Sequence, residues 1–140
     1  MTDIQFPNIL LGPGTVNAAV LDNNGAPATV LEASQPFTVH AEWDISPLAA
    51  LLLGGDWQLA AYVESIGAGP EQQIGPTVTV PLTGATSYSA DITVPAGTLP
   101  DNPAPPASGV YKTITVLTHT NFGAVTDVVG LVEGPVLRIG

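Results

Sequence analysis

Histidine and carboxylate side chains are the groups in this chain that could carry acid–base chemistry. His40, Glu42 and Asp44 follow one another at a spacing of two residues. In an extended strand this spacing puts all three on one face. Paired carboxylates can act in glycoside hydrolysis, but the same pair on an exposed strand is a solvated row of charges. We expect the solvated row, because no neighbour in the sequence completes a catalytic triad with His40.

The other known chemical motifs are missing. His119 ends a threonine-rich segment, where we expect a surface residue, and the chain has no cysteine and no His-x-His or His-x-x-x-His spacing for zinc. It also lacks Gly-x-Ser-x-Gly and Gly-Lys-Ser/Thr motifs. Calcium is conceivable at Asp22–Asn24 or around Asp101–Asn102, without the spacing of a known loop. The sequence predicts no enzyme, no cofactor and no metal site.

Apolar and polar side chains alternate through most of the chain. In residues 37–46 five apolar residues alternate with five polar ones, which is typical of a strand with one buried face. Pro81 cannot donate a ladder hydrogen bond and therefore favours an edge strand or a strand end. The same alternation recurs in four other segments, namely residues 16–20, 57–65, 78–82 and 87–94.

The remaining segments are less regular. Residues 110–120 are rich in β-branched residues but ambiguous in phase, which a bulge or burial of both faces would explain. Residues 128–139 are strand-like, with an interruption at Gly134–Pro135. We expect a polar loop at 67–76 and a proline-rich surface loop at 95–109. One short helical turn is expected near 47–53, capped by Ser46 and begun by Pro47.

These elements predict a single all-β domain over residues 1–140. The 14 Pro and 15 Gly are too many for a helical bundle. Seven to nine strands with frequent turns indicate an antiparallel two-sheet sandwich or a barrel, and two tryptophans on inward positions favour the sandwich. The segment Gly109–Val116 resembles the late strand of bacterial immunoglobulin-like and fibronectin-type domains, with Tyr111 matching their corner tyrosine. The resemblance covers about ten residues; it implies an immunoglobulin-like architecture and brings no functional residues with it.

Charge narrows the possible partners. Twelve acidic residues against two basic ones give a net charge of −10, which argues against binding nucleic acid or anionic membranes. The apolar run 48–53 is far too short to span a bilayer, and no signal peptide is visible. We expect an extracellular or particle-surface location, with membrane insertion excluded.

Self-association is the function that these features favour. Lysines normally guard the edges of sheets, and this chain has one lysine. We therefore expect a structural or interaction subunit, a homo-oligomer in a fibre, virion or cell-surface structure; a monomer with proline-blunted edges is the other reading. The helical leucines either plug the core or anchor a partner, and segment 4–11 either pairs within its own domain or is donated to a neighbour. The predicted interface residues are Ile4, Phe6, Ile9, Leu10, Leu48, Leu51, Leu52 and Leu53.

A binding module for carbohydrate or another small ligand is the alternative function. Outward-facing Tyr62 could offer an aromatic platform to a sugar, although an exposed tyrosine is also ordinary strand chemistry.

Overall fold

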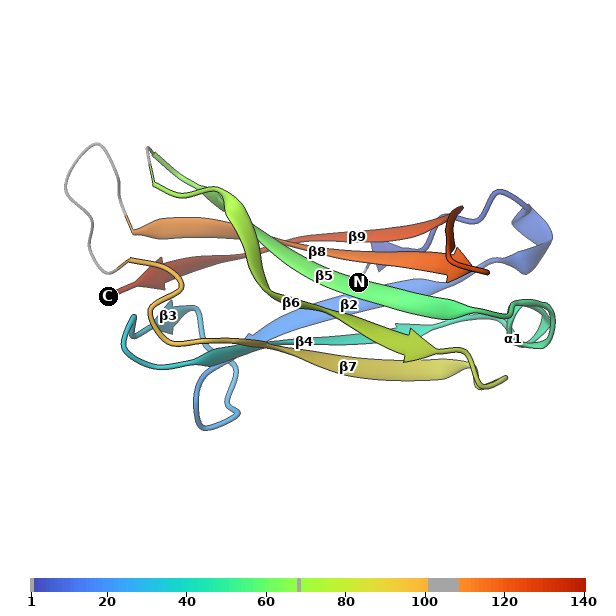
Figure 1. Ribbon diagram of the computed structural model, residues 1–140, viewed down its shortest axis with the longest axis horizontal. Coiled ribbons are helices and arrows are strands. Elements are labelled where there is room, and N and C mark those ends of the chain that lie inside the picture. The colour runs from blue at the N-terminus through green and yellow to red at the C-terminus, as the bar shows by residue number, and fades with distance from the viewer. Residues whose placement is uncertain (1, 68, 101–108) are drawn as a thin grey trace.

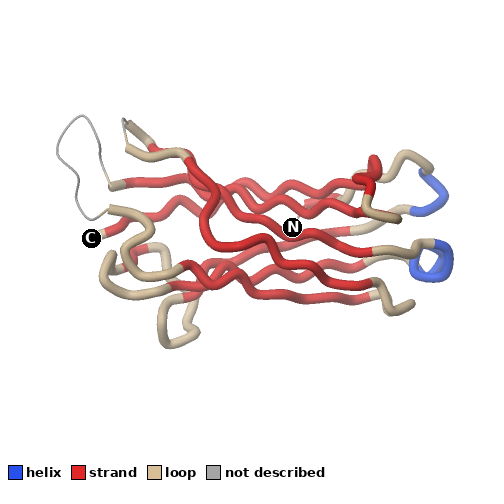
Figure 2. The backbone as a smooth tube through the Cα atoms, viewed as in Figure 1, coloured by secondary structure: helices blue, strands red, loops and turns tan. Residues whose placement is uncertain are grey.

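The chain folds into two β-sheets packed face to face, as Figures 1 and 2 show. The computed structural model describes residues 2–67, 69–100 and 109–140, and in them it has nine strands, one α-helix and one 3-10 turn. The elements are β1 (Thr2–Asp3), η1 (Ile9–Leu11), β2 (Thr15–Leu21), β3 (Val30–Leu31), β4 (Phe37–Asp44), α1 (Pro47–Leu52), β5 (Asp56–Ser65), β6 (Gln72–Pro81), β7 (Ser87–Val94), β8 (Val110–Asn121) and β9 (Ala124–Ile139).

The strand order is β1-β2-β4-β7 in one sheet and β3-β9-β8-β5-β6 in the other. The described strand pairs are antiparallel, apart from β3 and β9, which pair in parallel with Val30 beside Arg138. The prediction of a sandwich of seven to nine strands is therefore confirmed. Pro81 ends β6, an edge strand of its sheet, as its missing amide hydrogen predicts.

The core lies between the sheets and follows the alternation in the sequence. Along β4 the apolar residues are buried, and the polar residues between them face outward. Trp43 of β4 and Trp57 of β5 meet edge to face with ring centroids 6.1 Å apart, which joins the two sheets. Tyr88 of β7 stacks on Trp43 at 6.0 Å. The inward tryptophans thus fill the space between the sheets near the α1 end of β4 and β5.

The phase of β8 differs from what its β-branched residues suggest. Tyr111, Thr113, Thr115, Leu117 and His119 are buried, and the residues between them face outward. Alternation along β8 is unbroken, because the irregularity falls on the neighbouring strand. There the register shifts between Lys112 and Ile114, where two residues of β9 stand opposite one of β8.

Several sequence expectations are corrected by these positions. His119 is buried instead of exposed, because it continues the inward face of β8. Strand β9 runs through the expected break at Gly134–Pro135, and β6 begins at Gln72, inside the expected loop at 67–76. The Tyr111 hydroxyl finds no hydrogen-bond partner in the described part of the chain, so the expected corner bond is missing there. Burial raises the pKa of Tyr111.

The helical turn forms where its capping signals predicted it. The Ser46 hydroxyl accepts a hydrogen bond from the amide of Ala49 at 3.1 Å, and Pro47 occupies the first turn. None of the described helices is both long and apolar enough to cross a membrane. Most of the proline-rich loop expected at 95–109 lies outside the described residues.

Candidate interaction surfaces

His40 forms a polar cluster with two carboxylates on the outer face of the β1-β2-β4-β7 sheet. Its Nδ1 lies 2.5 Å from Oδ1 of Asp91 on β7, and its Nε2 lies 3.1 Å from Oε1 of Glu42. The hydrogen bond to Asp91, followed by the one to Glu42, raises the pKa of His40. Both carboxylates are well exposed, so the three side chains form a solvated surface cluster, as expected for this face of β4.

The other candidate ligands are used by the structure itself. Nε2 of His119 donates to the carbonyl oxygen of Gly54 at 2.6 Å, and its ring packs edge-on against Trp57. Oδ1 of Asp22 accepts hydrogen bonds from the amides of Asn24 and Ala26. These bonds form a turn at Asp22–Asn24, the first of the two segments considered for calcium. The second, at 101–102, lies outside the described residues. No group of three or more His, Asp or Glu side chains in the described ranges could hold a metal ion.

Tyr62, the candidate sugar platform, is exposed on the outer face of the β3-β9-β8-β5-β6 sheet. Its cross-strand neighbours are Gln73 on β6 and Ile114 on β8. The ring contacts found among the described residues do not include Tyr62. It is a single aromatic ring on an open sheet face.

Exposed apolar side chains gather at one end of the sandwich. Turn η1 and helix α1 lie in contact there, and the Ser46 hydroxyl donates to the carbonyl oxygen of Leu11 at 2.8 Å. The β8–β9 turn reaches the same end (Figure 1) and carries a fully exposed Phe122. We call this surface the end patch; its residues are Ile9, Leu10, Leu48, Leu51, Leu52 and Phe122.

The predicted interface residues divide into two groups. Ile4 is buried in the core, and Phe6 and Leu53 are partly buried against it. The other five are exposed and belong to the end patch. Helix α1 buries its alanines, Ala49 and Ala50, and so turns its leucines outward.

The N-terminal segment pairs within its own domain. Strand β1 pairs with β2, and the amide of Gln5 then donates to the carbonyl oxygen of Val129 on β9 at 2.7 Å. The segment therefore crosses from one sheet to the other. Residues 27–31 do the same further along: the amide of Ala28 donates to Val20 of β2, and β3 pairs with β9.

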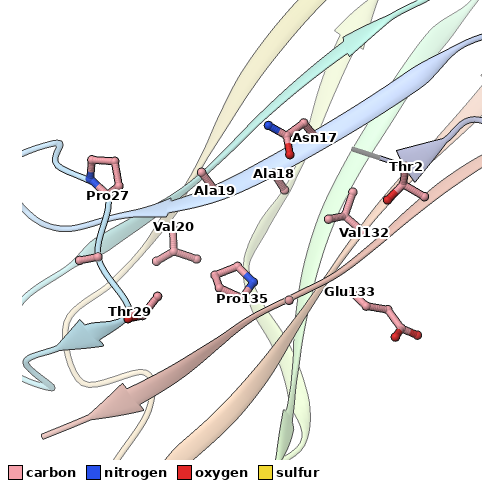
Figure 3. A pocket seen from close by; sticks show the side chains of 12 residues that line it. Thr2, Asn17, Ala18, Ala19, Val20, Pro27, Thr29, Val132, Glu133 and Pro135 are labelled. Atoms are coloured by element: carbon pink, nitrogen blue, oxygen red, sulfur yellow. The ribbon is translucent and has the colours of Figure 1, made fainter.

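Between these two crossings the edges of β2 and β9 line an open groove, which we call the seam groove (Figure 3). It has a volume of about 540 Å³. Its lining is small and mostly apolar, and Glu133 is its charged residue, paired with Lys112 at 3.0 Å. Its two walls include Asn17, Ala18 and Ala19 on β2 and Val132, Glu133 and Pro135 on β9.

Sequence reasoning missed the seam groove. It arises because β2 and β9, which are more than a hundred residues apart, end up on the same side of the sandwich, and because β1 and β3 are each two residues long. The sequence does not reveal that β1 and β3 are so short, because their length depends on the register in which they pair with β2 and β9.

Comparison with known proteins gives the fold and no family. No protein-family model matches the chain, and no curated protein matches it. Among solved structures, AggA, the major subunit of aggregative adherence fimbriae type I from Escherichia coli, is 12% identical with a TM-score of 0.50. The match covers 93% of this chain and 97% of AggA. At this identity the likeness shows a shared β-sandwich fold.

A second likeness is partial. The β-glucosidase of Listeria innocua in complex with glucose is 11% identical, with a TM-score of 0.49 over 91% of this chain. The chain spans 16% of the length of that enzyme.

Proposed function

We propose that this protein is a non-enzymatic structural subunit that assembles with copies of itself through the end patch. The exposure of the patch carries the proposal: Ile9 is 85% exposed, Leu51 is 79% exposed and Phe122 is fully exposed. Covering apolar surface stabilises a complex by roughly 25 cal/mol per Å² of area removed from water, before the costs of association. Exposed apolar side chains gathered at one end of a molecule are typical of contact sites.

The distribution of charge also favours the end patch as the contact. A net charge of −10 makes copies of the chain repel one another over most of their surface. The segments that build the patch, residues 4–21, 45–55 and 113–126, contain no Asp, Glu, Lys or Arg. Two copies can therefore meet there without bringing carboxylates together.

The fold is compatible with such a role. AggA, which shares the sandwich, is described as the major subunit of a fimbria, and we extend an assembling role to this chain as part of the proposal. An immunoglobulin-like class for the sandwich is part of the proposal, on the resemblance of the segment Gly109–Val116. The location we propose is extracellular or on the surface of a particle.

Light scattering after size-exclusion chromatography tests the proposal, with electron microscopy of the same sample. At tens of micromolar the wild type should form oligomers or filaments. The double variant Leu51→Asp/Leu52→Asp should be monomeric, because charge on the patch opposes its burial. Its circular dichroism and melting temperature should stay close to those of the wild type, since both leucines are exposed.

Val30→Asp is the matched control. It places one new carboxylate, against two in the double variant, on an exposed apolar residue of β3 outside the end patch, and it should assemble like the wild type. A monomeric wild type, or equal assembly of the double variant, would overturn the proposal. Unfolding of the double variant would instead identify the leucines as a core plug.

A further inference from the structure

We propose that the seam groove is the receptor for the end patch of a second copy, which inserts its Ile9–Leu10 turn between β2 and β9. The inference rests on the proposed function and adds the complementary surface. It makes the contact heterologous, patch to groove, so that each bound copy leaves one patch and one groove free. Such contacts extend into open chains of subunits unless the rotation closes a ring.

The walls of the groove offer unpaired main-chain groups. The carbonyl oxygen of Val20 on β2 accepts from the amide of Ala28, and that of Gly14, just before β2, accepts from the amide of Ile4. The main-chain groups of every second residue of β2 therefore point away from β4. The amide and carbonyl of Ala18 lie between these pairs, point the same way and bond to no described residue.

The opposite wall repeats this arrangement. On β9, Val129 exchanges hydrogen bonds with Gln5 on the side away from β8. By the same alternation, Leu131 and Glu133 direct their main-chain groups to that side, where the described chain supplies no partner. An incoming segment of backbone can therefore find donors and acceptors on both sheets.

The side chains of the groove leave room for an apolar guest. Ala18 and Ala19 on one wall and Val132 and Pro135 on the other are small or compact (Figure 3). Ala18 packs against the core, so a side chain inserted above it would extend the apolar interior. Glu133 is already paired with Lys112, so the described residues of the lining present no unpaired charge that favours a charged guest.

The Ile9–Leu10 turn has the properties of such a guest. Turn η1 buries none of its residues and lies in an uncharged stretch. Its backbone is held by hydrogen bonds within residues 8–12. The amide of Leu10 donates to Oδ1 of Asn8, and the amides of Leu11 and Gly12 donate to the carbonyl oxygens three residues before them. The groove and the patch are thus two nearly uncharged surfaces of an acidic molecule, one concave and one projecting, and this favours a second copy as the occupant.

A proline at position 131 tests the groove. Leu131→Pro removes an amide hydrogen that faces away from β8, so the internal ladder is kept, and Gly130 before it tolerates the added ring. Leu131→Ala is the matched control, because it truncates the same side chain and keeps the amide. We expect Leu131→Pro to weaken assembly by about tenfold or more, and Leu131→Ala to weaken it much less.

Mixing then tests the pairing of the two surfaces. Leu131→Pro keeps its patch and Ile9→Asp/Leu10→Asp keeps its groove. At the lowest concentration that assembles the wild type, each variant alone should therefore be mostly monomeric. An equimolar mixture should give a heterodimer of twice the monomer mass by light scattering. Ala18→Leu, which fills the groove with a side chain, replaces Leu131→Pro if circular dichroism shows that the proline variant is unfolded.

The outcomes separate the two proposals. Heterodimers in the mixture support patch-to-groove pairing. Assembly of both Leu131→Pro and Ala18→Leu at wild-type strength would overturn it while leaving assembly through the patch intact, as expected for patch against patch. A monomeric wild type would remove the proposed function and this inference together.

Discussion

The hydroxyl of Ser46 donates to the carbonyl oxygen of Leu11 at 2.8 Å and accepts from the amide of Ala49 at 3.1 Å. One side chain therefore caps α1 and ties it to η1, two segments more than thirty residues apart. This connection places exposed leucines of both segments on one surface. The η1 and α1 parts of the end patch are held together by it.

Removing this hydroxyl should loosen the end of the sandwich. Ser46→Ala loses the helix cap and leaves the Leu11 carbonyl without this donor, so we expect a loss of about 1–2 kcal/mol in the free energy of unfolding. For a domain of this size the melting temperature should fall by a few degrees. Ser46→Thr, which keeps a hydroxyl, should lie close to the wild type. Equal melting of all three proteins would show that the bond contributes nothing.

Two threonines on the buried face of β8 should respond in opposite directions to the same change. Thr115 has a buried hydroxyl that finds no hydrogen-bond partner among the described residues, so Thr115→Val should stabilise the fold by about 1 kcal/mol. Thr113 donates to the carbonyl oxygen of Pro135 at 2.8 Å, so Thr113→Val should destabilise it by a similar amount. Urea unfolding measures both, and a loss of stability in Thr115→Val would contradict the arrangement.

The close approach of β6 to β7 depends on Gly75. Its φ is +71°, and a Cβ there would lie 2.6 Å from Cγ2 of Ile92 and 2.9 Å from the carbonyl oxygen of Thr93. Gly75→Ala should therefore cost about 2–4 kcal/mol, from backbone strain together with overpacking. Gly84→Ala is the control, because its φ is +84° but no atom of the described residues lies within 4 Å of the added Cβ. It should cost about 1 kcal/mol; an equal loss in both variants would argue against the contact.

His40 should give the fold a pH dependence of known sign. Its pKa is raised above the unfolded value of 6.5 by its bonds to Asp91 and Glu42. The stabilisation is thus fully present below pH 6.5 and is lost as the pH rises through the higher folded pKa. The effect should be small, because all three side chains are partly exposed.

Urea unfolding of the wild type and His40→Gln between pH 5.5 and 8.5 isolates this contribution. The advantage of the wild type over the variant should shrink as the pH rises. A difference that stays constant, or grows, would show that the His40 cluster does not stabilise the folded state.

Local patterns in the sequence predicted the strands and the helical turn. Alternation over residues 37–46 and 57–65 fixed which side chains of β4 and β5 face inward, because the side-chain period of a strand is a property of its own backbone. Ser46 and Pro47 likewise marked the start of α1 through local capping chemistry. The exposed part of the predicted interface lies in two short apolar segments that the sequence indicates, η1 and α1.

Position within the sandwich was not predictable in this way. Alternation alone could not say that Thr113, Thr115 and His119 face inward, because their burial depends on Tyr111 and Leu117 sharing that face. Burial of His119 also requires Gly54, which is 65 residues away and accepts its hydrogen bond. Such contacts join distant parts of the chain and leave no local signature.

The amino-acid order by itself thus determined an acidic, cysteine-free chain of alternating strands with uncharged apolar segments, because composition and side-chain period are local properties. The tertiary structure decided that η1, α1 and the Phe122 turn share one end, and that β2 and β9 leave a groove between them. Both surfaces depend on which edges meet and in what register. The pairing and register of the strand edges are set by contacts between residues far apart in the sequence, and local preferences do not determine such contacts.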